Sequence, residues 1–163
     1  MASNLKNLSD YGINSIPSAK DMDFGIIVSE WNNEITNSLL NGAIDTLIAN
    51  GADKDNILVR YVPGSFELPL GAQILVDTDE VDAVICLGCV IQGETRHFDF
   101  ICNAVADGIM KLGLENSIPV IFGVLTTNTL EQAKDRSGGK HGNKGDEAAV
   151  SAIKMIALQM ELD

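Results

Sequence analysis

The sequence predicts an α/β fold: a three-layer α/β/α sandwich built around a four-stranded parallel sheet. Four short runs rich in Val and Ile are almost continuously apolar, which is typical of strands buried on both faces of a parallel sheet. Segments of helical periodicity alternate with these runs, so right-handed crossovers would place helices on both faces. Because the chain has 163 residues and no internal repeat, we expect a single domain over residues 1–163.

The elements follow one another as strand, helix, strand, helix, with two helices after the last strand. We expect strands at Phe24–Ser29, Ile57–Val62, Val81–Gly88 and Ile118–Leu125. The first helix is closed by Gly51, and the second tolerates Pro69 in its first turn. Helices are predicted at residues 35–48, Phe66–Val76, Phe98–Leu112 (ending at Gly113), Leu130–Arg136 and Asp146–Leu162.

Residues 1–22 are predicted to be an N-terminal arm. Met1–Lys20 is rich in Asn and Ser and contains Pro17, a composition typical of a loose tail. We see no basic region followed by an apolar run, so we expect no secretory signal, and the apolar stretches are too short to span a bilayer. Three Cys residues without a secretion signal indicate a reducing compartment, so we expect a cytoplasmic protein.

The charge argues against proteins that bind nucleic acid or membrane surfaces. Eleven basic and 23 acidic residues give a net charge of −12, which repels phosphate backbones and anionic lipids. Cys86 and Cys89 form a C-x-x-C pair inside a predicted strand, where they would point to opposite faces. No second pair of ligands accompanies them, so we interpret them as small core residues rather than as a metal or redox site.

Polar and aromatic side chains gather where the predicted strands end. Open α/β sheets bind ligands beyond the carboxyl ends of their strands. These loops supply the aromatics Trp31 and Phe66, amides, hydroxyls, a carboxylate and a histidine, which suits a planar polar heterocycle with a hydroxylated tail. The segments are residues 29–33, 62–67, 88–97 and 126–128.

The loop Gln92–His97 leads from the third strand into a helix. Gly93 allows a tight backbone, Thr95 can cap the helix, and the free N–H groups at the helix start attract an anion. The carboxylate of Glu94 would have to point away from that anion. His97 is either a solvated residue at a helix start or a proton-transfer group, since an imidazole titrates near neutral pH.

A basic cluster lies between the last two helices. Four of the eleven basic residues occur in one short stretch: Lys134, Arg136, Lys140 and Lys144. This stretch is either a solvated connection or a place where Arg136 grips phosphate with its planar fork. We expect His97 and Arg136 to converge in one cleft at the edge of the sheet, around a departing phosphate.

Four motifs, in this order, resemble the lumazine synthase family of riboflavin biosynthesis. The similarity runs from about Phe24 to the C-terminus, and the ordered set is more specific than any single loop. Trp31 departs from the family pattern, which usually has Phe there. The motifs are VPGSFELP (62–69), GCVIQGETRHFDF (88–100), FGVLTTNTLEQA (122–133), and DRSG (135–138) with GNKG (142–145).

The resemblance implies a flavodoxin-like fold and a condensation that needs no cofactor or metal. The substrates would be 5-amino-6-ribitylamino-uracil and 3,4-dihydroxy-2-butanone 4-phosphate. The product would be 6,7-dimethyl-8-ribityllumazine, with release of phosphate and water. This is the penultimate step of riboflavin biosynthesis, which makes riboflavin synthase a suggested partner.

The resemblance also implies roles for individual residues. His97 would transfer protons, Arg136 would bind phosphate, and the Glu94–Thr95 backbone would complete the phosphate site. Asp135 would orient Arg136 or tune His97. The pyrimidine would stack on Trp31, contact the backbone of Val90 and Ile91, and be reached from a neighbouring subunit by Phe122 and Lys144. The residues that would hold the ribityl chain are Asn32, Ser65, Phe66 and Glu67.

The resemblance further implies a pentamer, and some family members pack twelve pentamers into an icosahedral 60-mer. The short connection at residues 138–145 favours the shell, whereas Pro17 does not favour an arm that adds a strand to the neighbour's sheet. The alternative function is a shell protein of the same fold that binds ribityl ligands without turnover. Two other flavodoxin-like classes are disfavoured, because residues 29–33 carry only Glu30 where a phospho-receiver has several acidic residues, and they lack the Ser/Thr/Gly phosphate loop of an FMN electron carrier.

Overall fold

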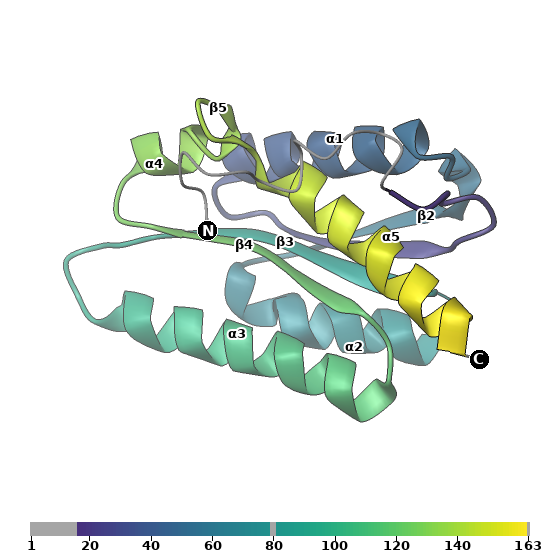
Figure 1. The fold of residues 1–163 in the computed structure, drawn as a ribbon. Coiled ribbons are helices and arrows are strands. Elements are labelled where there is room, and N and C mark those ends of the chain that lie inside the picture. The colour runs from purple at the N-terminus through teal and green to yellow at the C-terminus, as the bar shows by residue number, and fades with distance from the viewer. Residues whose placement is uncertain (1–15, 79–80, 163) are drawn as a thin grey trace.

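The computed structural model describes residues 16–78 and 81–162, and over these residues it confirms the predicted α/β/α sandwich (Figure 1). In the described part of the chain, four parallel strands form one sheet in the order β2-β1-β3-β4. The strands are β1 (Phe24–Ser29), β2 (Ile57–Val62), β3 (Ala83–Ile91) and β4 (Val120–Thr127).

Helices cover both faces of the sheet, as the alternating pattern predicts. Helices α1 and α5 lie on one face, and α2 and α3 lie on the other (Figure 1). The helices are α1 (Asn33–Ala49), α2 (Leu68–Thr78), α3 (His97–Asn116), α4 (Leu130–Lys134) and α5 (Lys144–Leu162), with short 3-10 turns η3 (Lys54–Asn56) and η4 (Ser65–Glu67).

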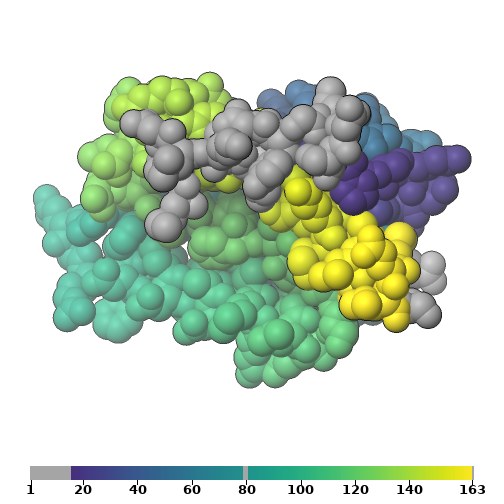
Figure 2. Space-filling view, viewed as in Figure 1, coloured from purple at the N-terminus to yellow at the C-terminus, as the bar shows by residue number. Residues whose placement is uncertain are grey.

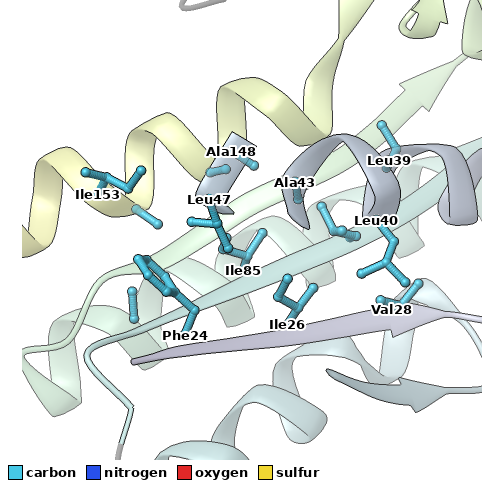
Figure 3. Packing of buried hydrophobic residues seen from close by; sticks show 14 of the residues in the cluster. Phe24, Ile26, Val28, Leu39, Leu40, Ala43, Leu47, Ile85, Ala148 and Ile153 are labelled. Carbon is cyan, nitrogen blue, oxygen red and sulfur yellow. The ribbon is translucent and has the colours of Figure 1, made fainter. Parts of the chain in front are cut away.

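The larger hydrophobic core lies between the sheet and the helices α1 and α5. Phe24, Ile26 and Val28 of β1 point toward the helices α1 and α5, which contribute Leu47 and Ile153 to the same core (Figure 3). All five side chains are fully buried. Each contributes about 1.5–3 kcal/mol by leaving water, so this face ties β1 to both helices.

A smaller core lies between the sheet and the helices α2 and α3, and it includes Ile27, Leu68 and Val105. Cys86 belongs to this core, whereas Cys89 belongs to the core on the opposite face. Burial raises the pKa of the Cys86 thiol to about 12 and that of Cys89 to about 11. The interpretation of the C-x-x-C pair as core residues on opposite faces is therefore confirmed, and neither thiol ionises near neutral pH.

The strand predictions fail in two respects. Ile57–Val62 is not buried on both faces, because β2 is an edge strand and its Tyr61 side chain is 54% exposed. The third and fourth strands begin at Ala83 and Val120 rather than Val81 and Ile118, and they end at Ile91 and Thr127 rather than Gly88 and Leu125. They continue because β3 and β4 pair with each other as far as Ile91 and Thr127.

Several helix ends also differ from the prediction. Helix α2 starts at Leu68 rather than Phe66, because residues 65–67 form the η4 turn, and α4 ends at Lys134 rather than Arg136. Helix α3 passes through Gly113 and ends before Ser117, which adopts a positive φ of 52°. A side chain at Gly113 would approach the carbonyl oxygen of Ile118 to 3.2 Å, so this glycine permits close packing rather than a stop. Helix α5 begins two residues earlier than predicted, where the Asn143 side chain accepts a hydrogen bond from the N–H of Gly145 at 2.8 Å.

The basic stretch between the last two helices has a regular structure, although Gly138, Gly139 and Lys140 at its tip are exposed. It forms a small hairpin of β5 (Ser137–Gly139) and β6 (Gly142–Asn143). The hairpin is fixed to α1, since the Asn143 amide donates to the carbonyl oxygen of Ser38 at 2.9 Å and the Ser38 hydroxyl donates to that of Ser137. These bonds fix to α1 the backbone that directly follows Arg136.

Part of the predicted arm packs into the core. Residues 1–15 lie outside the described residues. Ala19 and Met22 are buried in the larger core, and the N–H of Ala19 donates to the carbonyl oxygen of Asn50 at 2.8 Å. The core therefore begins before residue 22. Within residues 16–78 and 81–162, no helix combines the length and apolar character needed to cross a membrane.

Candidate active site

A cleft of about 410 Å³ lies where β1, β2 and β3 end, at the edge of the sheet from which the loop to α3 departs (Figure 1). Three loops that are distant in sequence meet there. The cleft brings together eight of the residues predicted for the site: Trp31, Asn32, Ser65, Phe66, Glu67, Val90, Ile91 and His97. We call it the His97 cleft.

The first wall of this cleft is the loop between β1 and α1. The N–H of Trp31 donates to the carbonyl oxygen of Pro63 at 3.1 Å, and the side-chain amide of Asn32 donates to that of Cys89 at 2.9 Å. The indole of Trp31 is 73% exposed. A large aromatic surface therefore stands at the mouth of the cleft and is free to stack on a ring.

The second wall is the η4 turn after β2. Phe66 is exposed at the mouth, whereas Ser65 is buried and its hydroxyl has no hydrogen-bond partner among the described residues. A side chain at Gly88 would lie 2.6 Å from the Ser65 oxygen, so the strand approaches this turn only because residue 88 is glycine. The Ser65 hydroxyl can hydrogen-bond to a polar ligand.

The third wall is the start of α3, where His97 is the first helical residue. The Thr95 hydroxyl accepts a long hydrogen bond from the N–H of His97 at 3.4 Å, but the N-cap position of α3 is Arg96, so Thr95 is not the helix cap that the sequence predicts. Glu94 and Thr95 are exposed and, within the described structure, do not line the His97 cleft. The predicted loop therefore flanks the cleft rather than forming its wall.

A second cleft, of about 610 Å³, lies along β4 and the first turns of α5. Three predicted residues line it: Phe122, Arg136 and Lys144. We call it the Arg136 cleft. One guanidinium nitrogen of Arg136 donates to the carbonyl oxygen of Gln132 at 3.0 Å. This bond holds the guanidinium in place and leaves further N–H groups for an anion.

Two ion pairs set the charge around the Arg136 cleft. The ammonium of Lys144 lies 2.5 Å from a carboxylate oxygen of Glu147, and both side chains are more than 80% buried. Asp135 pairs with Lys140 at 2.8 Å, not with Arg136 or His97, so neither role predicted for Asp135 is seen in the protomer. Arg136 therefore keeps its positive charge without a carboxylate partner among the described ion pairs.

A family model described as 6,7-dimethyl-8-ribityllumazine synthase matches residues 21–160. The chain belongs to the 6,7-dimethyl-8-ribityllumazine synthase family. A protein of that name from Cytophaga hutchinsonii is 61% identical over 96% of this chain and 98% of its own length. One from Parabacteroides distasonis is 56% identical over 96% and 98%, and one from Phocaeicola vulgatus is 55% identical over 99% and 96%.

One expectation for this lumazine synthase family member is wrong for the single protomer. His97 and Arg136 do not share a cleft: each lines its own. The His97 cleft lies at the ends of the strands β1 to β3. Arg136 instead lines a cleft along β4, which is an edge strand of the sheet. Arg136 therefore groups with Phe122 and Lys144, the residues that we expected to act from a neighbouring subunit.

Several residues that line the clefts of this lumazine synthase family member were not predicted as site residues, among them Cys89, Ile101 and Glu147. Cys89 and Ile101 line the His97 cleft, and Glu147 lines the Arg136 cleft. The spacing of Lys144 and Glu147, three residues apart on a helix, was a signal for their pairing. Cys89 and Ile101 gave no signal, because they look like ordinary core residues.

Proposed function

We propose that this protein catalyses the condensation of 5-amino-6-ribitylamino-uracil with 3,4-dihydroxy-2-butanone 4-phosphate. The products would be 6,7-dimethyl-8-ribityllumazine, phosphate and water, and the reaction would need no cofactor. Membership of the lumazine synthase family supports this activity. The aromatic and polar lining of the His97 cleft supports a pyrimidine with a ribityl chain as its ligand.

One observation extends the proposal: Trp31 and His97 lie in one cleft, and the cationic side chains lie in another. No Lys or Arg is among the described residues of the His97 cleft, yet one substrate is a phosphate ester. Arg136 and Lys144 lie in the other cleft with Phe122. We infer that the complete site forms between two protomers, where the His97 cleft of one meets the Arg136 cleft of the next.

In this site Trp31 would stack on the pyrimidine, and the η4 turn would hold the ribityl chain. Arg136 would bind the phosphate with charge-assisted hydrogen bonds. The 5-amino group attacks the ketone and an imine forms with loss of water. Elimination of phosphate then leaves an enol that tautomerises to a ketone, and the ribityl-bearing amine condenses with this ketone, losing a second water as the ring closes. Each step moves a proton, and His97 is placed to carry it, while holding two substrates together supplies much of the acceleration.

A pentamer would bring such clefts together, and a 60-mer shell is the larger assembly that we propose to test. Several apolar side chains on α2 and α3 are exposed in the protomer, as a subunit interface requires. The outer surface of α3 runs along the lower part of the molecule in Figure 2. These side chains are Leu70, Ile74, Phe100, Met110 and Leu114. We also propose a cytoplasmic location and riboflavin synthase as the enzyme that receives the product.

The test is to mix both substrates with purified protein and to follow the fluorescent lumazine. Light scattering on the same sample reports the assembly. Lumazine formation by an assembled protein supports the proposal. An assembled protein that binds the pyrimidine but forms no product would instead be the non-catalytic shell protein.

A further inference from the structure

We propose that Asn32 is a positioning residue that holds Trp31 over the His97 cleft by replacing the missing end of strand β1. The inference rests on the proposed function, in which Trp31 stacks on the pyrimidine. It assigns Asn32 a different main role from the ribityl contact that the family resemblance implies.

Strand β1 ends before its neighbour β3 does. The pairing of β1 with β3 stops at Val28 and Leu87, whereas β3 continues beside β4 as far as Ile91. Beyond Gly88, the backbone of β3 therefore has no strand on its β1 side. Cys89 is only 2% exposed, so water has poor access to its carbonyl oxygen and the protein must supply a donor.

Asn32 supplies that donor. Its side-chain amide donates to the carbonyl oxygen of Cys89 at 2.9 Å. Asn32 is also the N-cap of α1, where Asn commonly accepts a bond from the helix backbone, but here it makes no such bond. Its backbone adopts φ 61° and ψ 46°, a left-handed conformation that Asn tolerates better than most residues. The carbonyl oxygen of Asn32 accepts bonds from α1, whereas its side chain reaches β3 instead of capping the helix.

Trp31 is fixed by its neighbours rather than by packing. The indole is 73% exposed, so few contacts within the protomer hold it. Its own N–H is bonded to the carbonyl oxygen of Pro63, and the next residue is bonded to Cys89. The loop is therefore anchored to the segments that follow β2 and end β3. Without the Asn32 amide, one of these anchors is lost and the stacking surface becomes mobile.

Two substitutions separate this role from a direct contact with the ribityl chain. Asn32→Asp keeps the oxygen that could accept a bond from a ligand hydroxyl, but it loses the donor to Cys89. Asn32→Gly keeps the left-handed backbone and loses the whole side chain. Asn33→Asp is the matched control, because it adds the same charge at the adjacent, exposed position.

Trp31 is the single tryptophan of the chain, so its fluorescence reports the loop directly. The readouts are the anisotropy of that fluorescence in the free protein, its quenching by added 6,7-dimethyl-8-ribityllumazine, and the KM of each substrate. Circular dichroism and light scattering restrict the comparison to variants that fold and assemble. Asn32→Gly is the variant least expected to disturb folding, because its backbone conformation is retained.

We expect Asn32→Asp and Asn32→Gly both to lower the anisotropy of the Trp31 fluorescence. Both should also weaken the quenching by product and raise the KM for the pyrimidine substrate. We expect each of these two changes to be about tenfold, which corresponds to about one lost hydrogen bond. The KM for the phosphate substrate and the Asn33→Asp control should be unchanged. Unchanged anisotropy in both Asn32 variants, or wild-type behaviour of Asn32→Asp, would overturn the positioning role. If the product fails to quench even the wild type, the stacking role within the proposed function fails instead, while the anisotropy still tests the anchor.

Discussion

The ammonium of Lys144 and the carboxylate of Glu147 lie 2.5 Å apart, one helical turn apart on α5, inside the cleft that Arg136 also lines. Side chains exposed by only 17% and 15% give this pair a drier setting than the other ion pairs of the described structure. Glu147 neutralises Lys144, so Arg136 provides the net positive charge for an anion. The pair therefore fixes the position of Lys144 as well as the charge of the cleft.

Lys144→Met should destabilise the protein by about 1–3 kcal/mol, because it leaves the Glu147 carboxylate largely buried and unpaired. Denaturant unfolding at neutral pH measures this. Replacing both partners, with Lys144→Met and Glu147→Gln, should recover part of the loss.

The matched control is the exposed pair of Lys111 and Glu115, which lie 3.6 Å apart on α3. Lys111→Met should change stability little, since a solvated pair contributes little. Equal effects of Lys144→Met and Lys111→Met would show that burial of the Lys144 pair does not matter.

Arg136→Ala should raise the KM for the phosphate substrate by about 10- to 100-fold, the range expected for losing hydrogen bonds to a charged group. The KM for the pyrimidine substrate should hardly change. Steady-state kinetics with each substrate varied in turn measure both constants. Arg136→Lys keeps the charge without the planar fork and should lie between. An unchanged KM for the phosphate substrate in Arg136→Ala would remove Arg136 from its proposed role.

His97→Ala should lower kcat by about 100-fold without abolishing turnover, because proton transfer is lost while the two substrates are still held together. Single-turnover kinetics separate this step from binding. The chain has two histidines, and the other, His141, forms a backbone hydrogen bond to Asp135 in the hairpin. His141→Ala is the control and should leave kcat unchanged. Full activity of His97→Ala would exclude the imidazole from proton transfer.

Asp146→Asn should stabilise the protein at pH 7 and have little effect at pH 3.5. Burial first, then the nearby carboxylates of Asp45 on α1 and Glu147 on α5, raise the pKa of Asp146 above its usual value of 3.8. A raised folded-state pKa means that the ionised form costs free energy in the folded protein. That cost is absent below the unfolded pKa and fully present above the folded one.

Denaturant unfolding of Asp146→Asn and wild type at both pH values, at one protein concentration, measures the difference. Asp45→Asn should show a smaller effect of the same sign, because it removes only one of the two neighbouring charges. A gain that is equal at both pH values would show that the carboxylate charge of Asp146 is not its source.

The fold was predictable because its signals are local. Phe24–Ser29 and Ile57–Val62 are strands with the predicted bounds. The ends of β3 and β4 were missed because they depend on which strand lies alongside, which a run of apolar residues does not specify. Gly113 was misread as a helix stop, since glycine serves close packing as well as termination.

The site was predictable in its residue types and partly in its grouping. Loops that follow parallel strands meet at one edge of the sheet, so the sequence alone predicts that Trp31, Phe66 and His97 lie together. The structure places all three in one cleft. The position of Arg136 was not predictable in the same way. It depends on a hairpin held to α1 through Asn143, and a few small residues carry no periodic pattern that indicates such a contact.

The most direct test of a site shared between protomers is to mix two impaired variants, each lacking one of the two groups. His97→Ala and Arg136→Ala are co-expressed with different tags, and assemblies that carry both tags are purified. If one protomer supplies His97 and its neighbour supplies Arg136, about a quarter of the sites in an equal, random mixture regain both groups. At low phosphate-substrate concentration, the mixed assembly should then be far more active than either variant alone. Activity equal to the average of the two variants would contradict the shared site.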